Sequence, residues 1–126
     1  MTNRPSGIAR VSDLFHIIGS EPRLEILLAL GDGEACVCHL EEALGYRQAY
    51  VSQHLMALKE AGLLSTRRDG KYIYYRLEKP EIMKMVKLAA RLAEFDMSVI
   101  PAKVRRAKNT CECPTCSTDH LNHGDK

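Results

Sequence analysis

The chain has no long hydrophobic run. None of its 126 residues belongs to an apolar stretch approaching the roughly 18 residues that are needed to span a membrane. The first ten residues, MTNRPSGIAR, contain no apolar segment of the kind found in secretory signals. These absences predict a cytoplasmic protein with no membrane partner. In that reducing compartment, an odd number of cysteines, five, excludes the disulfide framework of a small secreted domain.

The sequence also lacks the residue patterns of an enzyme. It contains no activated nucleophile, no pair of general bases and no glycine-rich phosphate loop, so we do not expect catalysis. We find no internal repeat. The length suits one small domain with tails.

The formal net charge is small, but the charges are unevenly distributed. A value of +2 does not by itself indicate a nucleic-acid partner. Between residues 47 and 76, however, six basic residues stand against two acidic ones. A basic patch in a near-neutral chain is the electrostatic footprint of a phosphate-binding surface, although a solvated charged face is the alternative. The basic residues are Arg47, Lys59, Arg67, Arg68, Lys71 and Arg76.

Residues 47–60 have the periodicity of a helix. At about 100° per residue, Val51, Leu55 and Leu58 fall on one narrow arc, so this helix buries a single stripe. Gly62 follows the last periodic turn, as a helix stop does.

Two β-prone runs follow this helix. Residues 64–68 and 72–77 flank Asp69-Gly70, which is a strong hairpin signal. A helix that leads directly into a basic hairpin predicts the reading head of a winged helix-turn-helix. The expected fold class is therefore mainly α with a two-stranded β-wing.

Four other segments have helical spacing. The segment at 36–44, the glycine turn after it and the next helix have the spacing of a helix-turn-helix. The first and last helices carry more apolar surface than one small domain needs, so we expect them to form a homodimer interface rather than an intramolecular core alone. We expect residues 1–100 to form this dimerising DNA-binding domain and residues 101–126 to form a flexible tail containing three cysteines. The four segments are 8–19, 20–30, 36–44 and 80–100.

The five cysteines form two clusters, C-x-C and C-x-C-x-x-C. A single buried cysteine is often only a small hydrophobic residue. Two clusters in a reducing compartment instead predict a metal site, and thiolates select soft ions such as As(III), Cd(II), Pb(II), Cu(I) or Zn(II). No organic cofactor is expected. The predicted ligands are Cys36, Cys38, Cys111, Cys113 and Cys116.

The C-x-C spacing constrains how such an ion binds. Residues i and i+2 on a regular helix point about 200° apart and do not face each other. One ion can therefore hold Cys36 and Cys38 together only if the first turn of the 36–44 helix unwinds or never forms. Alternatively, one of them pairs with a tail cysteine from the same or the partner subunit.

With both motifs in view, the chain resembles the ArsR/SmtB family of metal-sensing repressors over roughly residues 11–95. The segment E-A-C-V-C-H-L at 34–40 is similar to the family's E-L-C-V-C-D-L metal box. Residues 61–63 and 67–71, with Tyr75, match the family's helix-to-wing segment. The recognition-helix pattern is matched by Gln48, Val51, Ser52, His54 and Leu55.

The resemblance implies a homodimeric transcriptional repressor of double-stranded operator DNA. A thiophilic ion would release it: As(III) or Sb(III), which suit three thiolates, or Cd(II), Pb(II) or Zn(II). A second hypothesis keeps the DNA binding but makes the thiols a redox or persulfide switch. A third, from another class, is an enzyme or metal-buffering protein, but a buffer needs no basic wing.

The chain departs from the family pattern at three places. Glu41 stands where the arsenic-sensing members carry a third box cysteine, so we expect tail cysteines to complete the thiolate shell. Arg47 replaces a serine that often caps the recognition helix. Residues 80–100 contain no histidine, so the zinc site of other relatives is not expected.

We expect the helix and the wing to make different DNA contacts. Arg67, Arg68 and Lys71 of the wing should contact phosphate, which fixes orientation without reading sequence. The helix should meet base edges in the major groove through Gln48, Ala49, Tyr50, Ser52 and Gln53, with Arg47 and His54 beside them. His54 flanks the buried stripe, so packing or a phosphate contact is its expected role, and His39 is expected to face solvent.

Overall fold

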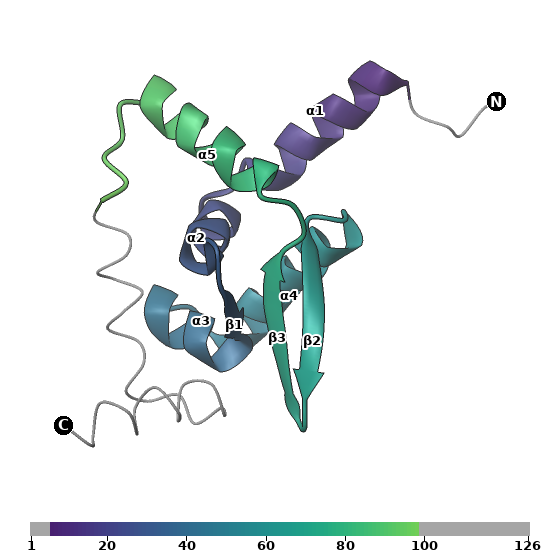
Figure 1. The fold of residues 1–126 in the computed structure, drawn as a ribbon, viewed down its shortest axis with the longest axis vertical. Coiled ribbons are helices and arrows are strands. Elements are labelled where there is room, and N and C mark those ends of the chain that lie inside the picture. The colour runs from purple at the N-terminus through teal and green to yellow at the C-terminus, as the bar shows by residue number, and fades with distance from the viewer. Residues whose placement is uncertain (1–5, 99–126) are drawn as a thin grey trace.

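The computed structural model describes residues 6–98 as five helices and three strands (Figure 1). The winged helix-turn-helix prediction is confirmed, with a mainly helical chain and a β-hairpin between the fourth and fifth helices. In chain order the elements are α1 (Gly7–Ile18), α2 (Glu21–Leu30), β1 (Glu34–Cys36), α3 (Val37–Leu44), α4 (Gln48–Glu60), β2 (Leu64–Asp69), β3 (Tyr72–Leu77) and α5 (Glu81–Leu92).

Local signals in the sequence set most helix ends. The Ser20 hydroxyl caps α2 by accepting from the Arg23 N–H at 3.4 Å, which satisfies one of the helix's unpaired donors. At the end of α4, Gly62 takes a φ of 82° and donates to the Lys59 carbonyl, while Leu63 donates to the Leu58 carbonyl. This pair of bonds is the Schellman arrangement, and it turns the chain directly into β2.

The predicted helix over 80–100 was too long. It ends at Leu92, because Glu94 adopts a φ of 56° and a second Schellman arrangement closes the helix. The N–H of Phe95 donates to the Ala90 carbonyl and that of Glu94 to the Arg91 carbonyl. The apolar periodicity of the sequence did not reveal this stop, because no glycine marks it.

The sheet has one strand more than predicted. Its order is β1-β3-β2 and both pairings are antiparallel. Asp69 pairs with Tyr72 across a two-residue loop, and Gly70 supplies the positive φ of 63° that such a loop needs at its first position. No strand was predicted at residues 34–36, and Cys36 was expected to begin a helix. These residues instead pair with β3, so α3 begins at Val37 rather than Cys36.

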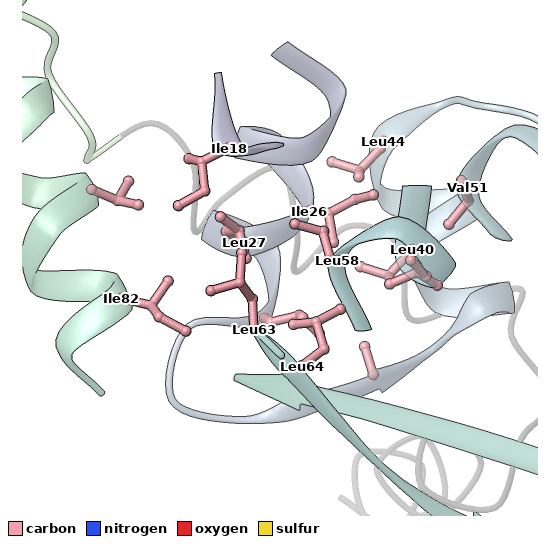
Figure 2. Close-up of a cluster of buried hydrophobic side chains, with 14 of the residues drawn as sticks. Ile18, Ile26, Leu27, Leu40, Leu44, Val51, Leu58, Leu63, Leu64 and Ile82 are labelled. Atoms are coloured by element: carbon pink, nitrogen blue, oxygen red, sulfur yellow. The ribbon is translucent and has the colours of Figure 1, made fainter. Parts of the chain in front are cut away.

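One hydrophobic core joins α2, α3 and α4 to the sheet and to α5 (Figure 2). Fully burying one such aliphatic side chain contributes about 1.5–3 kcal/mol relative to leaving it in water. Tyr75 and Leu77 pack against this core from the sheet. The least exposed aliphatic residues are Ile26, Leu27, Leu40, Val51, Leu55 and Leu58, each at 0%.

The end of the molecule formed by α1 and α5 exposes apolar side chains. In Figure 1, α1 and α5 lie at the end opposite the tip of the β2–β3 hairpin. Both helices expose large apolar side chains: Ile8, Val11 and Phe15 on α1, and Leu88 and Leu92 on α5. Ile8, Val11 and Phe15 follow helical spacing, so they form one stripe that the described chain leaves uncovered.

Within residues 6–98, no helix combines the length and apolar character needed to cross a membrane. The predicted tail, residues 101–126, lies outside the described residues, as do its three cysteines.

Candidate DNA interface and thiol site

The face of α4 opposite its buried stripe is exposed and carries no charge over the first three turns. Gln48, Ala49, Tyr50 and Gln53 are all exposed, as predicted for base-reading residues, while Ser52 is half-buried. Amide and small apolar side chains suit the base edges of the major groove, where glutamine pairs with adenine and methyl groups contact thymine. Sequence reasoning missed Met56, which is 59% exposed between Gln53 and Glu60 on the same face.

Arg47 precedes α4 as its N-cap residue. Its side chain makes no capping hydrogen bond and is exposed. The first turn of α4 therefore has donors that Arg47 does not satisfy. N–H groups at a helix N-terminus favour anionic partners, which suits an approach to phosphate.

A row of aromatic rings fixes the N-terminal half of α4 against α2. The ring centroids of Tyr46 and Tyr50 are 5.1 Å apart, and Tyr50 meets His54 edge-on at 4.6 Å. The Tyr46 hydroxyl donates to the Glu25 carboxylate, and this bond raises the pKa of Tyr46 to about 12. At the other end of the row, His54 Nδ1 accepts from Arg23 Nε at 3.0 Å.

His54 is thus held by α2. Burial, and secondarily the positive charge of Arg23, lowers the pKa of His54, so the neutral ring is favoured. Since Nδ1 accepts, the proton lies on Nε2, which is buried and has no hydrogen-bond partner among residues 6–98. Arg23 also donates to the Ile17 carbonyl at 3.0 Å, so its side chain connects α1 with His54 of α4. This geometry matches the packing role considered for His54 more closely than a DNA contact.

The wing carries the basic residues predicted from the sequence, but they have different surroundings. Arg68 and Lys71 are exposed near the hairpin tip, and the Lys71 ammonium lies 5.5 Å from the Tyr72 ring centroid. Arg67 instead forms a two-bond ion pair with Glu34, one of the bonds running from Nε to Oε2 at 3.2 Å. The hydrogen bond from Arg67 holds the pKa of Glu34 below its usual value.

The two box cysteines lie at the junction of β1 and α3. Cys36 ends β1 and is the N-cap of α3, with extended backbone (φ −87°, ψ 170°), and Cys38 follows in the first turn. Cys36 is buried at 2% exposure beside Tyr74, whereas Cys38 is half-buried. The first turn of α3 therefore includes Cys38 but does not extend back to Cys36.

His39, the next residue in the box, is buried at 7% exposure, so the expectation that it faces solvent was wrong. It lies on the inner side of α3 with Leu40 and Ala43.

The described residues do not by themselves form a metal site. Within residues 6–98, no group of three or more histidine, cysteine or acidic side chains is close enough to hold one ion. Cys36 and Cys38 provide two soft donors, which suits a thiophilic ion but leaves its shell incomplete. The predicted further ligands, Cys111, Cys113 and Cys116, lie outside the described residues.

Sequence reasoning did not connect Tyr74 with Cys36 and Cys38, or Glu34 with Arg67. Both connections join residues distant in the chain: Glu34 lies 33 positions from Arg67, and Tyr74 is the register partner of Cys36. The three residues of β1 are too short a run for the sequence to predict a strand.

A trihelical core, an exposed uncharged helix face and a basic hairpin together define a winged helix-turn-helix DNA-binding protein. A family model described as "Bacterial regulatory protein, arsR family" matches residues 20–66. The chain is 38% identical over 110 residues to the arsenical resistance operon repressor of Escherichia coli K12, covering 86% of this chain and 91% of that protein. The chain belongs to the arsR family of bacterial regulatory proteins.

Other relatives agree with this assignment. The cadmium resistance regulatory protein CadC of Listeria innocua is 34% identical over 85 residues, which is 67% of this chain and 71% of CadC. Among solved structures, HlyU from Vibrio cholerae superposes with a TM-score of 0.64 at 34% identity, covering 71% of this chain and 97% of HlyU. A homodimeric winged helix-turn-helix domain from Mycobacterium bovis gives 0.64 at 28% identity, covering 75% and 91%. These relatives are transcriptional regulators, and this chain is a regulator rather than an enzyme.

Proposed function

We propose that the protein is a homodimeric repressor that leaves its operator when a thiophilic metal or metalloid ion binds its cysteines. The observation that carries this proposal is the position of Cys36 and Cys38. They lie where β1 enters α3, so any change there moves the first helix of the helix-turn-helix. The names of the E. coli and Listeria relatives, which refer to arsenical and cadmium resistance, support a soft ion as the effector.

Cys36 and Cys38 would hold the ion, with Cys111, Cys113 and Cys116 completing the shell. The ion would supply bonds that fix both sulfurs around one centre. Since Cys36 lies in a strand and Cys38 in a helix, bringing their sulfurs together rotates the strand against the helix. The helix-turn-helix then no longer presents α4 as it does in the ion-free state.

DNA contact is assigned to the end of the molecule that carries α4 and the wing. Base edges are read by Gln48, Ala49, Tyr50, Ser52 and Gln53. The wing contacts phosphate. The exposed apolar stripes of α1 and α5 lie at the other end, where they pair two subunits. A two-fold dimer then sets the recognition helices about 34–36 Å apart, on successive turns of a pseudo-palindromic site.

The test has two stages. Ion-free protein first selects its operator from a randomised DNA library. The purified complex is then titrated with As(III), Sb(III), Cd(II), Pb(II) and Zn(II), and DNA binding is followed by fluorescence anisotropy. We expect at least one ion to weaken operator binding by about 5- to 150-fold, the usual range of allosteric coupling.

A separate titration with polysulfide and with peroxide tests the redox alternative. Cys36 is almost fully buried, so an oxidant in solution reaches it poorly. Release by polysulfide or peroxide, with no response to any ion, would replace the metal-responsive proposal by the thiol-redox one.

A further inference from the structure

The sheet has a face directed away from the main core, and the thiol site belongs to it. Cys36 and Arg67 are both register partners of Tyr74, from β1 and β2 respectively. Paired residues of antiparallel strands project from the same face. Cys36, Tyr74 and Arg67 therefore form one row across all three strands, which we call the thiol row. Cys36 and Tyr74 are buried at 2% and 1% exposure, whereas Arg67 at the β2 end of the row is exposed.

Arg67 spans the width of the sheet. Its guanidinium lies 4.5 Å from the centroid of the Tyr74 ring, over β3. The same guanidinium donates twice to the Glu34 carboxylate on β1, two residues before Cys36. The fork geometry of arginine allows both bonds at once, and a lysine would not reproduce it. Arg67 of the wing thus contacts Tyr74, the register partner of Cys36, and Glu34, which lies two residues before Cys36.

Arg68 differs from Arg67 although the two are adjacent. Successive residues of a strand point to opposite faces, so Arg68 is not part of the thiol row. It is exposed, and among residues 6–98 it has no ion-pair or ring partner. Its charge is not neutralised within the described chain, whereas that of Arg67 is matched by Glu34.

We propose that Arg67 is a positioning residue rather than a phosphate contact. It joins the wing to β1. As a result, ion binding at Cys36 and Cys38 changes the affinity of the wing for DNA, and DNA binding changes the reactivity of these cysteines. Phosphate contact from the wing falls to Arg68 and Lys71. This inference rests on the proposed function, and it names the physical connection by which the thiol site regulates the DNA surface.

The salt dependence of DNA binding separates the two arginines. Neutralising a phosphate contact lowers the slope of log K against log salt by about one. We expect Arg68→Gln to show that loss on both operator and random DNA. Arg67→Gln should keep the wild-type slope. A slope reduced equally in both variants would overturn the assignment.

Coupling is reciprocal, so DNA bound at the wing must change the thiol site. The alkylation rate of the box cysteines is measured with iodoacetamide, with and without saturating operator and with no metal present. Tryptic peptides resolve the sites, because Cys36 and Cys38 share the peptide 24–47 while the tail cysteines lie beyond Lys108. We expect operator to change the rate severalfold in wild type and in Arg68→Gln. The change should be absent in Arg67→Gln and Glu34→Gln.

Controls address folding and simple shielding. Shielding of the thiols by DNA would slow alkylation equally in all variants, and that result would overturn the proposal. A reversed pair, Glu34→Arg with Arg67→Glu, should restore the change that either single substitution removes, which a general folding defect would not allow. Failure to bind any operator selectively would refute the proposed function itself. Normal ion-induced release from Arg67→Gln would refute only this connection.

Discussion

At the scale of single residues, Gln53 of α4 carries the clearest prediction about DNA binding. It is exposed on the face of α4 opposite Val51 and Leu55, where an amide can bond to an adenine edge. We predict that Gln53→Ala weakens operator binding by about 1–3 kcal/mol and leaves binding to random DNA unchanged.

Arg68→Ala is the matched control for Gln53→Ala. A phosphate contact carries no sequence information, so this substitution should weaken operator and random DNA alike. Affinities are compared by anisotropy at one fixed salt concentration. Equal effects of the two substitutions on random DNA would show that base and phosphate contacts are not divided in this way.

We predict that His54 makes the free energy of unfolding depend on pH. Burial lowers its pKa in the folded chain below the ordinary 6.5, so at acidic pH the unfolded chain binds a proton more readily than the folded one. The free energy of unfolding should therefore fall as pH drops from 6.5 toward the folded pKa, and His54 should add no slope above 6.5. Protonation of Nδ1 would also break the bond from Arg23.

Urea unfolding at pH 7.5 and 5.5 measures this effect. His54→Gln should flatten the loss, because an amide oxygen can accept from Arg23 and does not titrate. His16→Gln is the control, since His16 is exposed and should keep the wild-type loss. An identical loss in wild type and His54→Gln would show that other groups set the acid sensitivity.

At the scale of elements, the proposed effector site lies at the junction between β1 and α3. Replacing both Cys36 and Cys38 by Ser keeps the size of each side chain but removes the soft donors. We predict that operator binding persists, with a change of less than about 1 kcal/mol, while release by the effector ion is lost. Both quantities are read from the same anisotropy titration.

Truncation after Thr110 tests the other part of the predicted site. It removes Cys111, Cys113 and Cys116 together. We predict weaker ion binding and a reduced response, since the remaining two thiolates leave the shell incomplete. If truncation abolishes the response while the double serine variant responds normally, the sensing site lies in the tail, and Cys36 and Cys38 are only packing residues.

At the scale of the whole molecule, the question is what covers α1 and α5. Leu92 is 80% exposed and Leu88 is 56% exposed, so neither contributes much to the core of one chain. We predict that Leu92→Asp shifts the protein from dimer to monomer in sedimentation at micromolar concentration. Burying an unpaired carboxylate in an apolar interface is strongly unfavourable.

Lys87→Asp provides the control on the same helix. Lys87 is also exposed but lies away from the stripe that Leu88 and Leu92 form, so this variant should remain a dimer. A wild-type protein that sediments as a monomer, and stays monomeric on operator DNA, would contradict the homodimer.

The sequence alone determined the elements whose signals are local. Ser20 before a proline, the stripe of Val51, Leu55 and Leu58, the stop at Gly62 and the turn at Gly70 each act within a few residues. They specified α2, α4 and the hairpin, and with them the winged helix-turn-helix. The box cysteines and the basic wing were visible for the same reason, because each motif is continuous in the chain.

Tertiary structure decided what depends on residues far apart. Only pairing with β3 makes residues 34–36 a strand, and only that pairing brings Glu34 to Arg67. The burial of His39 and the hold of Arg23 on His54 likewise arise from packing between helices. Such contacts cannot be recognised from hydrophobic periodicity in the sequence, because the local sequence around each residue would look the same without its partner. The different surroundings of Arg67 and Arg68, which are adjacent and chemically identical in the sequence, therefore come only from the fold.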